Sequence, residues 1–271
     1  MARPSMNSVT LSAVEFDVVW RGSGLGAPPA VLRIPSPGRT HTTRRHIEAE
    51  VWAALRDRGP AWGAGVDPAL ERLLHLLAEP PVRVEIRAWG AATVRAALAG
   101  GRDGSALAQR CGDGVVLAPC TSLAGAVVGV LGTARPGPGR AAVVAAVDLE
   151  AALRRPTGAG LRTDLVDHGV DPAEAGPIAR MLGGIDRRAQ ISVLVPDRLG
   201  ILRRAGEPLE VLDGPRGRYL LTRCRGADGT AWTCVTPVDD RRLNHRLSEW
   251  FDAARPISPG RRAASAAGPP P

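Results

Sequence analysis

The chain has 271 residues, of which 44% are apolar and 23% are charged, and its formal net charge is +8. These proportions are typical of a soluble globular protein with a substantial core. Aromatic residues make up only 3% of the chain, too few for a stacking platform for unpaired bases, and no helix-turn-helix, zinc-finger or RRM motif is visible. Composition therefore argues against sequence-specific nucleic-acid binding. A basic nucleic-acid-associated protein remains the alternative function.

The N-terminal segment predicts two helices joined by an extended stretch. Residues 11–20 place apolar side chains at helical spacing, and a Pro-Pro pair then favours an extended chain over residues 30–34. A second helix is expected to begin at Thr42 or Thr43 and to end at the Gly-Pro pair of residues 59–60.

Residues 67–132 predict a helix, a set of strands and a closing helix. Asp67 can cap the first helix, and Pro68 suits its first position because the amide there has no partner in a helix anyway. Alternating apolar and polar residues then favour strands of an antiparallel sheet with one face in water. The strand segments are residues 82–89, 93–99, 105–111 and 114–120. The closing helix is expected to be capped by Thr121 or Ser122.

Residues 114–134 carry no charge and are long enough to span a membrane. Pro119, Gly125 and Gly129 interrupt the segment, so a buried strand followed by a buried helix explains it better. We therefore predict no membrane insertion. Acidic residues near the N-terminus stand where the apolar part of a signal peptide would lie, which predicts a cytoplasmic protein.

Residues 171–252 repeat the order of the first pass. Asp171-Pro172 begins a helix, and Glu174 has the spacing of a capping box. The strand segments are residues 189–196, 208–213, 218–224 and 231–237. The closing helix is expected to begin at Asp239 or Asp240 and carries one apolar stripe of Leu243, Leu247, Trp250 and Phe251.

This recurrence predicts an α+β fold built by internal duplication, with an antiparallel sheet shared by the two halves and flanked by helices. We expect one domain over residues 9–254, with its repeated halves at about 67–132 and 171–252. Residues 255–271 hold one strong apolar residue, Ile257, and predict a disordered tail. The competing interpretation is that any α+β chain shows some recurrence of helix, strand and turn.

No catalytic or metal-binding pattern stands out. The five histidines are scattered, and the sequence contains neither His-Glu-x-x-His nor Gly-x-Ser-x-Gly. The four cysteines form no Cys-x-x-Cys pair, so we expect buried, reduced thiols and no zinc site. The glycine-rich residues 22–26 follow a predicted helix instead of opening one, which argues against a phosphate loop. The sequence thus predicts a binding protein with no catalytic residues and no cofactor.

The order of several segments over most of residues 9–252 resembles the EspG family of chaperones associated with type VII (ESX) secretion in actinobacteria. The resemblance is carried by residues 11–40, 48–59, 67–80, 82–89 and 217–247. These motifs are structural, and their order and spacing carry the resemblance more than any one of them does. Residues 93–118 depart from the family pattern because they are less clearly strand-like.

The resemblance implies a pseudo-two-fold α+β fold with a central antiparallel sheet and flanking helices. It also implies a cytosolic chaperone that binds the helical tip of a PE–PPE heterodimer, covers its apolar surface and keeps it soluble for export. Family members use neither a cofactor nor ATP. The client of this chain, which is either a PE–PPE pair or another helical WXG-type substrate, is not specified by the resemblance.

Two segments are candidates for the partner-binding surface. One is the predicted hairpin tip at Gly100, Gly101, Arg102 and Asp103, for which an ordinary flexible turn is the alternative. The other is the closing helix with Leu243, Leu247 and Trp250, for which packing in the core is the alternative.

Overall fold

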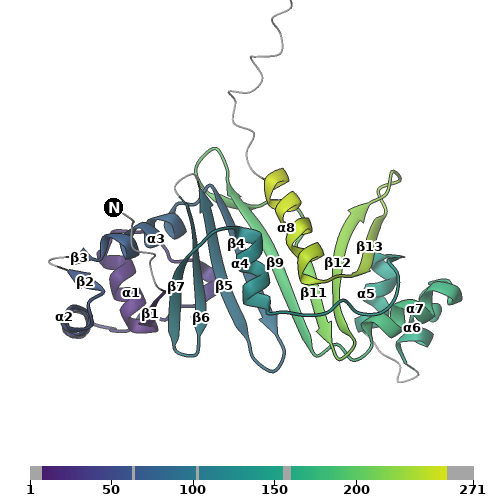
Figure 1. Cartoon of the computed structure of the whole chain (residues 1–271), viewed down its shortest axis with the longest axis horizontal. Coiled ribbons are helices and arrows are strands. Elements are labelled where there is room, and N and C mark those ends of the chain that lie inside the picture. The colour runs from purple at the N-terminus through teal and green to yellow at the C-terminus, as the bar shows by residue number, and fades with distance from the viewer. Residues whose placement is uncertain (1–7, 63–64, 102–103, 155–159, 255–271) are drawn as a thin grey trace, which may run out of the picture.

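The computed structural model describes residues 8–62, 65–101, 104–154 and 160–254 (Figure 1). The predicted tail and the candidate residues Arg102 and Asp103 lie outside the described residues. The first part of the chain forms, in order, β1 (Val9–Ser12), α1 (Ala13–Gly22), η1 (Ala30–Leu32), α2 (His41–Arg58), β2 (Ala61–Trp62), β3 (Gly65–Val66), α3 (Pro68–Ala78), β4 (Val82–Trp89), β5 (Val94–Gly101), β6 (Gly104–Cys111), β7 (Gly114–Cys120) and α4 (Leu123–Leu131). The second part forms β8 (Ala142–Ala145), α5 (Ala146–Arg154), α6 (Leu161–Asp167), α7 (Pro172–Leu182), β9 (Arg187–Pro196), β10 (Leu202–Arg204), β11 (Leu209–Gly214), β12 (Gly217–Arg225), β13 (Ala231–Pro237) and α8 (Asp240–Ala254).

One large antiparallel sheet dominates the fold. Its strand order is β1-β7-β6-β5-β4-β9-β11-β12-β13-β8, with β10 paired to β9, while β2 and β3 form a separate pair. Counting outward from the central β4–β9 pair, the order is the same on both sides: β5, β6, β7 and β1 match β11, β12, β13 and β8. The α+β class with a large antiparallel sheet flanked by helices is therefore confirmed. The division into two repeated halves within one domain is a proposal that this symmetric order supports.

The strand symmetry extends the recurrence toward the N-terminus of each half. The two halves predicted from the sequence begin at α3 and α7. In the structure, β1 and β8 also occupy equivalent edges of the sheet, and each is followed by a helix. Each of these edge strands has only four residues. So short a strand carries too little alternation to be recognised from sequence.

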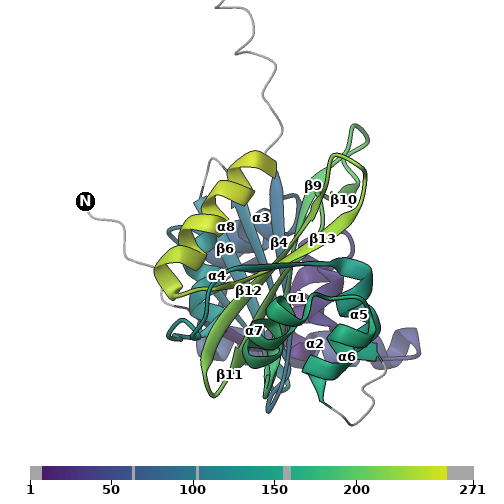
Figure 2. The same ribbon diagram turned by 90° about the vertical axis from the view of Figure 1, so that its right-hand side faces the viewer.

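Helices cover both faces of the sheet, as Figure 2 shows. On one face, α4 and α8 pack over the central strands and enclose the core around Ile86, Leu98 and Ile191. On the other face, α1, α2 and α3 cover the outer strands of the first part, and α5, α6 and α7 cover those of the second. Figure 1 shows these two helical groups at opposite ends of the long axis. The central strands β4 and β9 lie between the two groups.

The strands predicted from residues 82–120 and 189–237 are all present, three of them with the predicted limits: β4, β7 and β13. The caps of α3 and α7 are Asp67 and Asp171, whose side chains accept from backbone amides of the first turn. Glu174 does not complete a capping box, because its carboxylate binds Arg140 at 2.6 Å.

Two N-terminal expectations were wrong. Residues 30–34 were expected to be extended, but residues 30–32 form the short helix η1 against β5. The cap of α2 is Thr40, not Thr42 or Thr43, because the Thr40 side chain accepts from the amide of Thr43. Both errors concern short polar or proline-rich stretches in which several local conformations have similar energy.

The uncharged segment of residues 114–134 divides into β7 and α4, as expected. Within the described ranges, no helix is long and apolar enough to cross a membrane. Ser122 caps α4 by accepting from the amide of Gly125, and the helix then buries Leu123, Val127 and Leu131 against the sheet. The apolar character of the segment is thus explained by burial within the protein.

A buried guanidinium joins four elements at one end of α8. Arg218 of β12 is 1% exposed and donates to both carboxylate oxygens of Asp213 in β11, at 2.7 and 3.1 Å. It also donates to Asp240, the first residue of α8, at 2.9 Å, and to the carbonyl of Leu131 at the end of α4. Because these groups come from four separate elements, Arg218 sets where α4 and α8 meet the second part of the sheet.

Candidate partner-binding surface

The strand register gathers two loops at one end of the sheet. Gly100, near the end of β5, is paired with Val82, and Leu194, near the end of β9, is paired with Arg83 in the same strand β4. The β5–β6 and β9–β10 connections therefore leave the sheet at the same end. Figures 1 and 2 show that α8 also ends toward this end of the sheet. We call this region the hairpin end. It comprises the buried Gly100 and the more accessible Gly101, Leu199, Ile201 and Trp250.

The two glycines of the hairpin end have a packing role. Gly100 is buried, and a Cβ added to it would lie 2.7 Å from a methyl group of Leu123. Gly101 is partly exposed and faces Pro81 and Leu76. The absence of a side chain at Gly100 lets the start of α4 approach the end of β5 closely. Of the two, only Gly101 offers surface to a partner.

The apolar stripe of α8 divides between core and surface. Leu243 and Leu247 are fully buried and pack with α4 over the sheet. They cannot contact a partner while the core is folded. For these two leucines, the prediction of a partner contact was wrong, and packing in the core is the correct interpretation. Trp250 is only partly buried, and its ring centroid lies 5.8 Å from that of Phe251. Trp250 therefore remains a candidate contact, supported from beneath by the core.

The most exposed large apolar side chain described lies on the β9–β10 turn, which sequence reasoning missed. Leu199 is 82% exposed and Ile201 is 48% exposed. Asp197 shapes the turn, since its carboxylate accepts from the amides of both residues at 2.9 and 3.0 Å and binds Arg203 at 3.1 Å. These hydrogen bonds, the one from the Ile201 amide first, hold the pKa of Asp197 below its usual value. A usable signal was present: an apolar residue on each side of the turn glycine Gly200.

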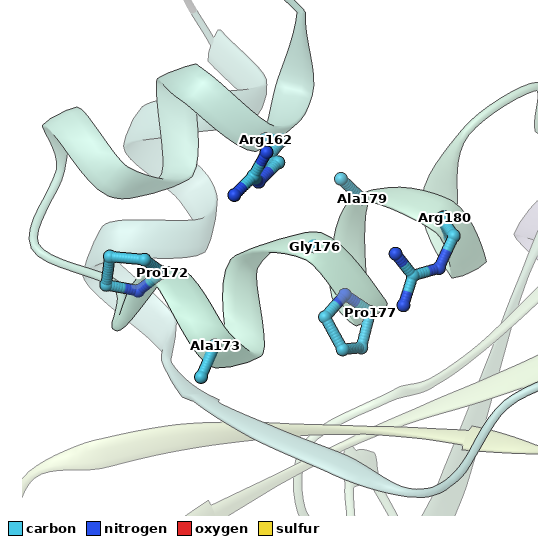
Figure 3. A pocket seen from close by; sticks show the side chains of 7 residues that line it. All are labelled: Arg162, Pro172, Ala173, Gly176, Pro177, Ala179 and Arg180. Atoms are coloured by element: carbon cyan, nitrogen blue, oxygen red, sulfur yellow. The ribbon is translucent and has the colours of Figure 1, made fainter.

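The described residues form no cluster of the kind that binds a metal ion. No group of three or more histidine, cysteine or acidic side chains there could hold a metal ion. A surface pocket lies between α6 and α7 and is lined by Arg162 and Arg180 with proline, alanine and glycine residues (Figure 3). This lining contains no nucleophile and no general base.

The expectation of buried thiols was wrong for two of the four cysteines. Cys111 and Cys224 are exposed because they lie at or next to the ends of strands beside hairpin turns, while Cys120 and Cys234 are half-buried. All four are free. Burial raises the pKa of the Cys120 thiol to about 11, so this group is a poor nucleophile near neutral pH.

Comparison with known proteins places this geometry in a family. The model of the EspG family matches residues 12–249, and the chain belongs to that family. Its fold is similar to that of the type VII secretion system chaperone EspG5 of Mycobacterium tuberculosis, solved in complex with a PE25–PPE41 dimer. The TM-score is 0.71 at 16% identity, and the alignment covers 93% of this chain and 98% of that one. A search among curated proteins gives no match.

Proposed function

We propose that this protein is a cytosolic chaperone of a type VII secretion system that binds PE–PPE-like helical heterodimers and keeps them soluble for export. The observation that carries the proposal is membership of the EspG family over residues 12–249. The likeness in fold to a chaperone solved with a PE–PPE dimer supports it. The protein acts in this proposal by binding alone, with no catalysis, cofactor or nucleotide.

The hairpin end supplies the apolar contact that such a role needs. Leu199 and Ile201 project from a turn braced by Asp197, and Trp250 of α8 packs against the core. Rigid apolar side chains at an interface bind with little loss of conformational entropy. A chaperone that binds an apolar patch of the folded client stabilises the client by mass action. When the free chaperone is well above Kd, this stabilising free energy grows with the logarithm of the ratio of the free chaperone concentration to Kd.

Co-expression with a PE–PPE-type pair encoded beside its gene tests the proposal. The expected result is a soluble stoichiometric complex that is insensitive to added nucleotide and survives size-exclusion chromatography. The double substitution Leu199→Asp and Ile201→Asp should weaken the complex by about 100-fold, since two apolar contacts are replaced by solvated charges. Val147→Asp is the matched control, because Val147 is also an exposed apolar residue but lies on α5, away from the hairpin end.

Failure of every neighbouring PE–PPE-type pair to co-purify with the wild-type chain would refute the chaperone function. A complex that forms equally well with the double variant and with Val147→Asp would refute the hairpin end as its contact surface. Salt-sensitive binding to nucleic acid in place of the pair would favour the alternative function.

A further inference from the structure

One register row crosses the whole sheet on the face that carries the two separated helical groups. Successive Cα partners join one residue from each strand, and the row reads Leu11, Val115, Arg110, Arg95, Arg87, Gln190, Glu210, Leu221, Val235 and Ala142 from β1 to β8. Its apolar ends are buried beneath the two helical groups. Its five central residues are polar and are not fully buried. The middle of this face is therefore polar and partly accessible to solvent.

Three arginines stand directly opposite one another in this row. Arg87, Arg95 and Arg110 come from the neighbouring strands β4, β5 and β6. Like charges at directly opposed positions of a sheet destabilise it. Many side chains would be accepted at half-exposed strand positions, so three consecutive arginines are an arrangement that folding does not require.

A fourth arginine adds to the same positive field. Arg33 follows η1 as its C-cap with φ at 49°, in the left-handed region that residues other than glycine rarely adopt, and its carbonyl accepts from Arg110 at 3.2 Å. Partial burial lowers the pKa of Arg95, and the charges of Arg33, Arg87 and Arg110 lower it further. Among the described residues, the only carboxylate within 4 Å of these four guanidinium groups is that of Glu85, 3.7 Å from Arg87. Ion pairs among the described residues therefore leave most of this positive charge uncompensated.

We propose that the arginine row, Arg33, Arg87, Arg95 and Arg110, binds carboxylate side chains on a helix of the client. Neighbouring strands lie about 4.8 Å apart. Acidic residues at positions i and i+4 of a helix lie about 5–6 Å apart. A client helix running across the strands would thus present successive carboxylates to successive arginines, which guanidinium groups bind in bidentate fashion.

The rest of the chain argues that these carboxylates come from another protein. Residues 1–7 and 255–271 contain no acidic side chain, so neither terminal segment supplies a carboxylate side chain for this row. A nucleic acid fits less well than a protein, because Glu85 and Glu210 lie on the same face and would repel a continuous phosphate chain. Trp89, 43% exposed at the end of β4, offers an apolar contact beside the row.

This inference rests on the proposed function and adds a second contact area to it. Arg87, Arg95 and Arg110 lie toward the end of their strands that is opposite the hairpin end. Charged contacts at this second area would set the orientation of the client and its rate of association.

The test compares Arg95→Glu and Arg95→Gln with the control Arg56→Glu in the full chain. Arg56 is an exposed arginine of α2, and its substitution makes the same change in net charge. The probe is the PE–PPE pair that co-purifies with the wild-type chain. We expect Arg95→Glu to weaken the complex by at least about tenfold and Arg56→Glu by less than about twofold. Arg95→Gln should weaken it by an intermediate factor and should make the affinity less sensitive to salt.

Thermal unfolding of the free variants separates binding from folding. Because Arg95 faces three other cations, Arg95→Gln should unfold at the same temperature as the wild type or at a higher one. If the wild type binds the PE–PPE pair and Arg95→Glu binds it with the same affinity, this inference is overturned and the proposed function stands. Absence of binding by the wild type would instead overturn the proposed function, and this inference with it. A labelled single-stranded oligonucleotide that binds the wild type tightly and Arg95→Glu weakly would also overturn the assignment to a protein helix.

Discussion

Replacing Arg218 with alanine is expected to destabilise the folded protein by about 3 kcal/mol. The substitution removes a guanidinium that is 1% exposed and that joins Asp213, Asp240 and the carbonyl of Leu131. Breaking a fully buried ion pair by removing one partner costs about 3–5 kcal/mol, because the remaining charge is left in a poor environment.

The lower end of that range applies because the two carboxylates remain partly solvated and keep other partners. The Asp213 and Asp240 side chains are 18% and 30% exposed. Asp213 also lies 3.8 Å from Arg187, and Asp240 accepts from the amide of Ala134. The substitution Asp213→Asn should therefore lower the free energy of unfolding less in the Arg218→Ala background than in the wild type. In that background the carboxylate of Asp213 has already lost its main partner.

Urea unfolding followed by circular dichroism measures these free energies, provided that the slope with urea is the same for all variants. The matched control is Arg223→Ala on the same strand, where the arginine is exposed and its pair with Glu150 at 2.5 Å lies at the surface. That control should cost less than about 1 kcal/mol. If Arg218→Ala costs no more than the control, the four-element junction does not hold α4 and α8 in place.

The remaining predictions concern packing, ionisation and the proposed surface. Gly137→Ala should lower the stability by about 1–3 kcal/mol in the same assay, because the new Cβ would lie 2.1 Å from the ring of buried Tyr219; an unchanged stability would show that the ring can move aside. Between pH 9 and about 11, the free energy of unfolding should fall more steeply for the wild type than for Cys120→Ala. The reason is that the Cys120 thiol ionises in the unfolded chain while it stays neutral in the folded one; parallel pH profiles would contradict this. Leu243→Asp should abolish folding as judged by circular dichroism, whereas Trp250→Ala should leave the protein folded and reduce binding of a PE–PPE-type pair, and the reverse result would exchange their roles.

The candidate site could be predicted only in part. The sequence placed Gly100, Gly101 and Trp250 in a proposed surface. The fold puts the two glycines at the end of the sheet toward which α8, the helix of Trp250, also ends. Leu243 and Leu247 belong to the core, because an apolar stripe shows that a helix has a buried face without showing what covers it. Leu199 was missed because periodicity does not reveal exposure in a short turn, and the only signal, the apolar pair that flanks Gly200, is not a periodic one.

The sequence alone determined the parts of this protein that depend on neighbours along the chain. Alternation of apolar and polar residues located β4, β7 and β13, and aspartate followed by proline located α3 and α7, because these effects act within a few residues. Only the tertiary structure decided the pairing of β4 with β9, the burial of the α8 leucines and the alignment of Arg87, Arg95 and Arg110. The three arginines belong to separate strands, and a register shift of one residue would turn a side chain to the other face of the sheet. Their meeting depends on contacts between strands, which no local pattern in the chain encodes.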